Sequence, residues 1–317
     1  MIDLLILKGD IMSLGIAFVE GKFTPLAEAK ISIFDHGFMR GDAVFDAVSV
    51  WEGCFFRLDD HIARFKRSCA ELRMTCPVGE ADITRLAAQC VQRASLTEAL
   101  FYMICTRGQP TDPSIRDPRL CNNRFMCYAL PYNWAAPKEK VQSGIAVAIP
   151  TTRRIPPECV DPRAKNFNRM DIARASLEAY DRGADCAILL TVDGYVSEGS
   201  GYNVFLAKDG VLATPQWNIL EGITRQTVFD LAAELDIVTQ TRIITPEELF
   251  NADEVFLSST AGGIMPVTLV NDVVIGSGRP GPVTTEIGDL YWTKRAQGWL
   301  STPVADLLQV VSKQGTT

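Results

Sequence analysis

The chain has 317 residues, 47% of them apolar, which is enough to bury a substantial core and argues against disorder over most of its length. Its net charge of −7 and its scattered basic residues argue against nucleic acid as a partner, because binding to phosphates needs clustered Lys and Arg. The nine cysteines include no Cys-x-x-Cys pair, a pattern that indicates reduced thiols and a cytoplasmic location. No signal peptide is expected at the acidic-flanked residues 4–7, and no apolar run reaches the roughly 20 residues of a membrane span.

The first third of the chain alternates strand and helix signals. Hairpins are expected over 16–25, around Glu20-Gly21, and over 43–58, around Glu52-Gly53. Apolar residues at steps of three and four then predict helices over 58–72 and 83–91. Strands are expected at 99–106 and 125–130, with a polar, proline-containing loop between them.

The second half shows the same mixture. Strands are expected at 145–149, 186–191 and 203–207, helices at 171–182 and 224–235, and a capping box marks a further helix at Thr245. Since strands and helices do not alternate strictly, we expect an α+β fold in two halves. The boundary is placed in the Pro-, Lys- and Arg-rich stretch after residue 131: a smaller N-terminal domain over 1–134, a linker over 135–143, and a larger C-terminal domain over 144–317.

Several familiar sites are not expected. His36 and His61 are the only histidines and no His-Glu-x-x-His motif exists, so we expect no metal site. No Gly-x-Ser-x-Gly nucleophile motif is present. Residues 276–281 match the dinucleotide-binding fingerprint, but Pro280 and Pro282 are expected to disrupt the helix start, so we interpret this stretch as a surface loop.

The informative block runs from Lys165 to Glu198. The lysine precedes an expected helix, in the motif Asp161-Pro-Arg-Ala-Lys165-Asn-Phe-Asn. The glutamate lies on a Gly-rich bend between two strands, in the motif Tyr195-Val-Ser-Glu198-Gly-Ser-Gly-Tyr-Asn203. Three further motifs occur in order: Arg57-Leu-Asp-Asp-His61-Ile-Ala-Arg64-Phe, Leu220-Glu-Gly222-Ile-Thr224-Arg, and Ser258-Ser-Thr260-Ala-Gly-Gly-Ile-Met-Pro266. Together they resemble the signature of the fold-type IV (class IV) aminotransferases, over nearly the whole chain.

The resemblance implies pyridoxal 5′-phosphate as cofactor and a role for each matching residue. Lys165 is the Schiff-base and proton-transfer residue, because the aldehyde of that cofactor needs a primary amine. Glu198 holds the proton on the cofactor's ring nitrogen. For the phosphate, Arg64 supplies a guanidinium, and the N–H groups of Ile223 and Thr224 lie at a helix start. Thr260 binds the same phosphate, Leu220 packs on the ring face, and His61 either packs near the cofactor or is structural.

Within the family, the chain most resembles the (R)-selective amine transaminases. The shared stretches are Phe45-Asp-Ala-Val-Ser-Val-Trp51-Glu-Gly, Phe56-Arg-Leu-Asp-Asp-His61, Asn122-Asn123, Leu130-Pro-Tyr-Asn-Trp134, Arg153-Arg154-Ile-Pro-Pro157 and the Glu198 and Thr260 motifs. The resemblance implies transfer of an amino group from an (R)-amine or D-amino acid to a keto acid such as pyruvate, in a homodimer. The expected substrate residues are Phe45, Trp51, Arg116 and Ala261.

Departures from that subgroup keep alternatives open. Arg169 replaces a frequent aromatic residue, and Phe45 replaces a frequent Tyr. Arg107, Arg116 or Arg119 could bind a substrate carboxylate, and Arg116 is our choice. The alternative enzymes are a D-amino acid transaminase, a branched-chain L-amino acid transaminase and an aminodeoxychorismate lyase. A cofactor-holding protein without turnover is a further alternative, although the intact Lys165 and Glu198 pair argues against it.

Overall fold

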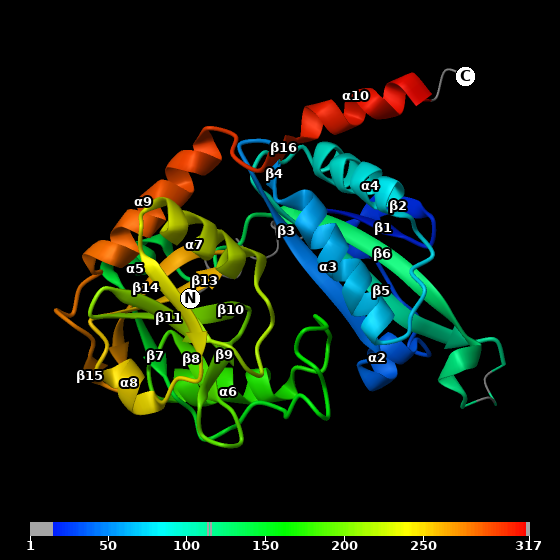
Figure 1. Cartoon of the computed structure of the whole chain (residues 1–317). Coiled ribbons are helices and arrows are strands. Elements are labelled where there is room, and N and C mark those ends of the chain that lie inside the picture. The colour runs from blue at the N-terminus through cyan, green and yellow to red at the C-terminus, as the bar shows by residue number, and fades with distance from the viewer. Residues whose placement is uncertain (1–14, 113, 115, 315–317) are drawn as a thin grey trace, which may run out of the picture. The chain divides into compact units, whose positions relative to one another are not determined.

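The structure is a computed structural model that describes residues 15–112, 114 and 116–314, so the apolar residues 4–7 lie outside the described part. The chain divides into two units (Figure 1). The first unit comprises Met1–Asn133, Ala164–Asn168 and Gly298–Thr317, and the second comprises Trp134–Arg163 and Arg169–Gln297.

The first unit is built on a seven-stranded antiparallel sheet in the order β16-β4-β3-β5-β6-β1-β2. Its strands are β1 (Ile16–Val19), β2 (Lys22–Pro25), β3 (Ala43–Trp51), β4 (Cys54–Phe56), β5 (Ala99–Pro110), β6 (Cys121–Pro131) and β16 (Ser301–Pro303). Its helices are α2 (His36–Arg40), α3 (Leu58–Glu71), α4 (Glu80–Arg93) and α10 (Val304–Gln314), with short 3₁₀ turns at Leu26–Glu28 and Pro118–Leu120. Both expected hairpins and both expected long helices are confirmed.

The core of the first unit lies between one face of this sheet and the helices α3 and α4. Alternate residues of β3, among them Val44 and Val48, pack in one apolar cluster with Ile62 and Phe65 of α3 and with Ile83 of α4. The intervening residues of β3 therefore lie on the opposite face of the sheet.

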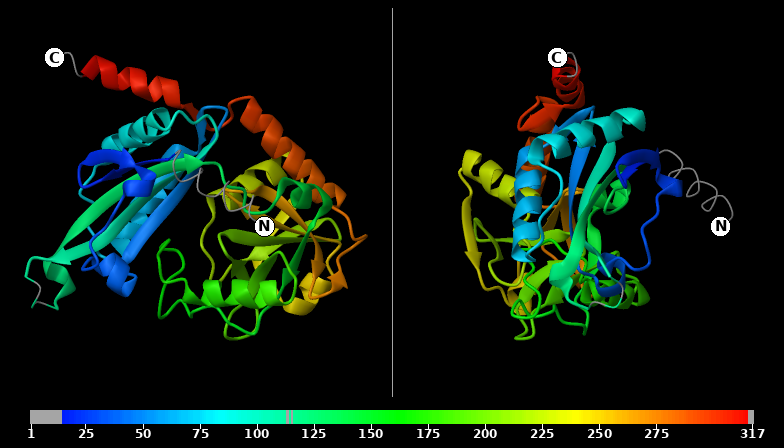
Figure 2. Two further views of the ribbon diagram at one scale, coloured as in Figure 1. Left: turned by 180° about the vertical axis from the view of Figure 1, so that it is seen from behind. Right: turned by 90° about the vertical axis from the view of Figure 1, so that its right-hand side faces the viewer.

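The second unit contains a nine-stranded sheet in the order β12-β11-β10-β13-β14-β7-β8-β9, with β15 paired to β14. Because β9 also pairs with β10, six of these strands close on themselves like a barrel. The strands are β7 (Ile145–Ala148), β8 (Cys186–Leu190), β9 (Val196–Gly199), β10 (Tyr202–Lys208), β11 (Val211–Pro215), β12 (Val238–Arg242), β13 (Glu254–Ser259), β14 (Gly263–Val270) and β15 (Val273–Val274). The helices are α5 (Lys138–Ser143), α6 (Met170–Asp181), α7 (Ile223–Glu234), α8 (Pro246–Phe250) and α9 (Pro282–Ala296). Figure 2 shows α9 and α6 on opposite sides of these strands.

The helix α9 corrects one expectation from the sequence. Residues 276–281 do form a loop, but Pro282 does not disrupt a helix start: it is the first residue of α9. Proline is tolerated there because its missing N–H has no partner within the first helical turn. The next two N–H groups, of Val283 and Thr284, are satisfied by the buried carboxylate of Glu254.

The division into units differs from the expected domain limits in three places. Residues 135–143 belong to the second unit and carry α5. Residues 164–168 belong to the first unit, because Phe45 N–H donates to the Lys165 carbonyl and Phe167 N–H donates to that of Ala43. Residues 298–317 also belong to the first unit, because β16 pairs with β4. Among the helices of the described residues, none combines the length and apolar character that a membrane span requires.

Candidate active site

Lys165 lies in a short segment that extends along the edge of β3. The Phe45 N–H donates to the Lys165 carbonyl at 2.9 Å, and the Lys165 N–H donates to Ser68 Oγ of α3 at 3.0 Å. Both backbone polar groups of the lysine are therefore held by the first unit. Its half-buried side chain places Nζ 4.6 Å from the centroid of the Phe45 ring.

The face of the sheet that bears Phe45 is lined with aromatic rings. Strand alternation and register place Phe45 and Trp51 of β3, Tyr102 of β5, Tyr128 of β6 and Tyr132 after β6 on this face, which we call the aromatic face. Tyr102 stacks on Tyr128 with ring centroids 4.8 Å apart, and Trp51 meets Tyr132 edge-on at 5.7 Å. The amine of Lys165 thus lies at one end of an aromatic surface within the first unit.

On the opposite face of β3, a buried ionic cluster fixes Arg64. The guanidinium donates from Nε to Asp46 Oδ2 and from Nη2 to Asp46 Oδ1, both at 2.8 Å. His61 Nδ1 lies 2.8 Å from Asp46 Oδ1, and all three side chains are buried. Since Arg64 is bound at two points, its guanidinium plane has a defined orientation.

The charges of this cluster follow from its burial. Burial by itself raises the pKa of the Asp46 carboxyl, but the Arg64 guanidinium and the His61 ring outweigh it and hold that pKa well below its usual range. Burial lowers the pKa of His61, and the attraction of Asp46 does not compensate. The cluster therefore holds one cation, one carboxylate and a neutral imidazole. We assign the imidazole proton to Nδ1, facing the carboxylate.

In the second unit, Glu198 of β9 is held by three donors. Its oxygens accept from Arg154 Nη2 at 2.9 Å, from Leu220 N–H at 2.8 Å and from Asn203 Nδ2 at 3.4 Å. The other end of the Arg154 guanidinium donates to Asp171. Together these donors fix the orientation of the Glu198 carboxyl group.

Arg154 is correspondingly bound between two carboxylates. Burial by itself lowers the pKa of its guanidinium, but Glu198 and Asp171 outweigh this effect and raise the pKa above its ordinary value. The arginine is therefore a permanent cation, and one of its two neighbouring carboxylates, Glu198, also contacts the loop that carries Leu220.

Two of the residues expected to bind phosphate lie at the end of the same loop. Ile223 and Thr224 open α7, whose N-cap Gly222 provides no side-chain cap and whose first turn has no acidic residue. A Cβ at Gly222 would lie 2.1 Å from Asn203 Oδ1, so only glycine allows this approach to the residue that contacts Glu198. Uncapped N–H groups at a helix start are suited to an anion.

The turn that carries Thr260 and Ala261 lies on the neighbouring hairpin of β13 and β14. Across β13 and β10, Ser258 pairs with Asn203, and Ser259 Oγ donates to the Gly201 carbonyl. The buried Ser258 hydroxyl has no hydrogen-bond partner among the described residues. An unsatisfied buried hydroxyl beside a helix N-terminus is consistent with a site that a polar ligand completes.

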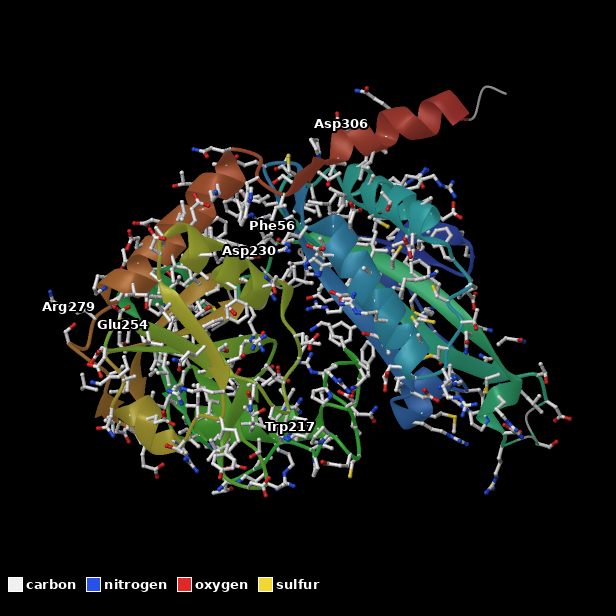
Figure 3. All side chains as sticks on the ribbon, in the orientation of Figure 1. Phe56, Trp217, Asp230, Glu254, Arg279 and Asp306 are labelled. Carbon is white, nitrogen blue, oxygen red and sulfur yellow. The ribbon has the colours of Figure 1, made fainter. Side chains whose placement is uncertain are left out.

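The expected residues therefore gather in two groups, one in each unit. The first unit holds Phe45 and Lys165 and, on the other face of β3, Arg64, and the second unit holds Glu198, Leu220, Ile223, Thr224, Thr260 and Ala261. Each group has chemistry suited to part of a phosphorylated aromatic aldehyde: the first offers an amine and a guanidinium, and the second offers a carboxylate and helix N–H groups. Figure 3 shows the side chains of both units. No group of three or more His, Cys, Asp or Glu side chains in the described residues is placed to hold a metal ion.

The loop arginines differ in how strongly they are held. Arg107 donates to both oxygens of Asp42 and to the carbonyls of Leu72 and Arg73, and Arg119 is bound to Asp117. Arg116 is exposed in the loop between β5 and β6.

Three residues of the site were missed from the sequence: Asp46, Arg154 and Asn203. Asp46 carried a signal, because the alternation of Val44, Asp46 and Val48 places a carboxylate on the buried face of a strand. Arg154 and Asn203 appeared only within motifs, and nothing in their spacing indicated a bond to Glu198.

Comparison with known proteins places the chain in a family. Residues 43–270 match the family model for amino-transferase class IV. The chain is 33% identical over 277 residues to a putative branched-chain-amino-acid aminotransferase of Methanocaldococcus jannaschii, covering 86% of this chain and 94% of that one. It is 30% identical over 269 residues to a D-alanine aminotransferase of Bacillus licheniformis, covering 84% and 92%.

Solved structures agree. The branched-chain amino acid aminotransferase of a T.th. strain, complexed with N-(5′-phosphopyridoxyl)-L-glutamate, superposes with a TM-score of 0.84 at 30% identity, covering 92% of this chain and 98% of that one. The chain belongs to the class IV aminotransferases, enzymes of fold type IV that use pyridoxal 5′-phosphate to transfer amino groups.

Proposed function

We propose that the chain transfers an amino group from an (R)-amine or D-amino acid to a keto acid such as pyruvate, with Lys165 as the proton-transfer residue. The observation that carries this proposal is the position of Lys165 Nζ, 4.6 Å from the Phe45 ring at one end of the aromatic face. An amine there can bind the cofactor and, once displaced by substrate, move a proton between the substrate Cα and the cofactor.

The remaining roles follow from the contacts of each residue. When bound, pyridoxal phosphate supplies an aldehyde and an electron-withdrawing ring. Glu198, oriented by its three donors, keeps a proton on the ring nitrogen. Arg64 binds the phosphate, and Asp46 sets the orientation of its guanidinium. The N–H groups of Ile223 and Thr224, together with Thr260, bind the same phosphate. Leu220 covers the ring face.

The proposed donor rests on two features: the sequence stretches that resemble those of the (R)-selective amine transaminases, and the aromatic face. Phe45 and Trp51 offer rings that suit an aryl or alkyl substituent. Since Asp42 and Asp117 bind Arg107 and Arg119, Arg116 is our candidate for a substrate carboxylate, with Ala261 lining the pocket.

A branched-chain L-amino acid aminotransferase is the second candidate, and a specific observation favours it. Several relatives carry that name, including those of Methanocaldococcus jannaschii and Escherichia coli. The D-alanine aminotransferase of Bacillus licheniformis has a comparable identity of 30%, so relatedness does not decide between the two donors.

We further propose a cytoplasmic homodimer. Four apolar side chains around α2 of the first unit are more than half exposed: Ile33 (67%), Phe34 (63%), Phe38 (65%) and Met39 (56%). An apolar patch of this kind is typical of an interaction surface. All nine cysteines are free thiols, as expected in a reducing compartment.

The test is a donor panel with the purified holoenzyme, containing (R)- and (S)-1-phenylethylamine, D- and L-alanine, D- and L-leucine, and 4-amino-4-deoxychorismate. Each donor is added alone, and the cofactor absorbance is followed. A change in cofactor absorbance with (R)- or D-donors, and no change with their mirror images, supports the proposal. A preference for L-leucine would instead establish the second candidate. Release of pyruvate from 4-amino-4-deoxychorismate would instead identify a lyase.

A further inference from the structure

Ser68 of α3 makes two hydrogen bonds through a single hydroxyl group. Its Oγ donates to the Arg64 carbonyl at 3.0 Å and accepts from the Lys165 N–H at 3.0 Å. The serine is 1% exposed, so water has little access to either bond. A serine hydroxyl has one proton to donate, and the bond to the Arg64 carbonyl uses it. The Ser68 oxygen therefore faces the Lys165 N–H as an acceptor.

The bond from Ser68 to the preceding helical turn also occurs elsewhere in this chain. Ser176 of α6 donates from its Oγ to the Ile172 carbonyl at 3.0 Å, with the same spacing of four residues. Such a bond fixes the rotamer of the serine side chain. At Ser68 it fixes an oxygen that also accepts from an N–H 97 residues further along the chain, so α3 is connected to the segment that carries Lys165.

The other backbone groups around Lys165 are held from different directions. The Phe45 N–H of β3 donates to the Lys165 carbonyl at 2.9 Å. The buried Asn166 side chain donates from Nδ2 to the Ala164 carbonyl and accepts at Oδ1 from the Asn168 N–H, both at 2.8 Å. The strand thus holds the carbonyl of the lysine, the asparagine shapes the chain on either side of it, and the hydroxyl from α3 holds its N–H.

We propose that Ser68 is a positioning residue for the amine that binds the cofactor: its hydroxyl fixes the backbone of Lys165, and with it the point from which Nζ reaches the aldehyde carbon. This inference rests on the proposed function, in which Lys165 binds the cofactor and carries the proton. The lysine amine lies at the end of a flexible side chain, so a shift of the backbone is passed on to Nζ. Displacing a reacting group by about 1 Å can cost ~10² in rate.

A positioning role and a packing role predict different results for two substitutions. Ser68→Ala keeps a small side chain at the buried site but removes the acceptor from the Lys165 N–H. Ser68→Thr keeps the hydroxyl, because threonine in a helix can make the same bond to the preceding turn. If the hydrogen bond is what matters, the alanine variant is impaired and the threonine variant is not.

The first measurement follows attachment of the cofactor to Lys165. Apoenzyme is mixed with pyridoxal 5′-phosphate, sodium borohydride is added at successive times, and peptide mass spectrometry gives the fraction of Lys165 that carries the reduced cofactor. We expect Ser68→Ala to slow this labelling by about fivefold or more, close to the ~tenfold that one net hydrogen bond represents. Ser68→Thr should recover most of the rate. The matched control Ser176→Ala should label as the wild type does.

The second measurement separates kcat from KM in the steady state. Ser68→Ala should lower kcat by about the same factor as the labelling rate, because the misplaced amine also carries the proton. The KM of the amine donor should stay within about twofold of the wild-type value, since the substitution removes no group assigned to the substrate. Circular dichroism and thermal unfolding verify that each variant is folded.

The outcomes distinguish this inference from the proposed function. If borohydride labels no Lys165 in the wild type, the proposed function fails, and this inference fails with it. If the wild type is labelled at Lys165 and Ser68→Ala is labelled equally fast, the positioning role alone is overturned. Labelling of Ser68→Thr as slow as that of Ser68→Ala would also overturn it, because the hydroxyl would then not be the feature that matters.

Discussion

Glu198 and Arg154 form a buried ion pair, with Oε1 2.9 Å from Nη2. The carboxylate also accepts from the Leu220 N–H, while Arg154 donates to Asp171 as well. Donors from three different segments, Arg154, Asn203 and Leu220, thus fix the orientation of the Glu198 carboxyl group.

Glu198→Gln is expected to keep the fold and much of the cofactor binding, because the amide oxygen can still accept from Leu220 N–H. The rate of Cα proton removal should fall, since a neutral amide does not hold a proton on the ring nitrogen. Single-turnover absorbance with an amine donor measures this rate. The matched control is Glu221→Gln on the same loop, which is exposed. Wild-type single-turnover kinetics in Glu198→Gln would show that Glu198 is only structural.

Lys165→Ala should abolish turnover, because the proposed function makes this residue both the cofactor amine and the proton carrier. The proton transfer alone accounts for roughly 10²–10⁴ in rate. Lys138→Ala is a suitable control, since Lys138 belongs to the second unit and its amine lies over Trp134. Activity close to wild type in Lys165→Ala would contradict the central assignment.

Arg64→Ala is expected to weaken cofactor binding about tenfold or more, given ~1.5–3 kcal/mol for a hydrogen bond to a charged group. Asp46→Asn should weaken it less, because Arg64 remains but loses its charged partner. Equilibrium dialysis of the cofactor measures both dissociation constants. If Arg64→Ala binds the cofactor as the wild type does, Arg64 serves only the buried cluster.

The neutral His61 makes stability depend on pH. The pKa of His61 is lower in the folded protein than in the unfolded chain, where it is near the usual ~6.5, so the unfolded chain binds more protons below that pH. The free energy of unfolding should therefore fall on acidification, by at most about 1.4 kcal/mol per pH unit from this group. Urea unfolding at pH 7.5 and 5.5 measures the change, and His61→Asn should reduce it. Equal pH dependence in both proteins would mean that His61 titrates normally.

The sequence correctly predicted those structural features that depend on residues close together in the chain. The capping box at Thr245 is present with both of its hydrogen bonds, and the helix with Ile62 and Phe65 faces the core as its apolar spacing required. Pro282 was misjudged because the same residue ends a helix when it is internal and begins one when it is first.

From the sequence, the site could be predicted only as a set of motifs in a given order along the chain, without the contacts between their residues. The bond between Arg154 and Glu198 joins residues 44 positions apart, and no periodicity encodes it. The membership of Lys165 in the first unit likewise depends on pairing with β3, a contact between distant segments. Such contacts result from tertiary packing, which local patterns do not specify.

The last prediction concerns donor class and handedness. In the proposed function Lys165 delivers its proton from one face of the cofactor. The binding of the two donor substituents then decides which enantiomer presents its Cα–H to the lysine. We assign the binding of these substituents to Phe45, Trp51 and the loop with Arg116. Arg116→Ala should impair D-alanine and pyruvate more than (R)-1-phenylethylamine, because only carboxylate-bearing substrates lose a charge-assisted hydrogen bond. The matched control is Arg119→Ala, since Asp117 already binds Arg119. The measurement is kcat/KM for each substrate with each variant.

An equal loss of kcat/KM on both substrate types in Arg116→Ala would remove the carboxylate role from Arg116, while the roles of Lys165 and Glu198 would be unaffected. A clear preference of the wild type for L-leucine over every (R)-donor would leave the branched-chain reaction as the function.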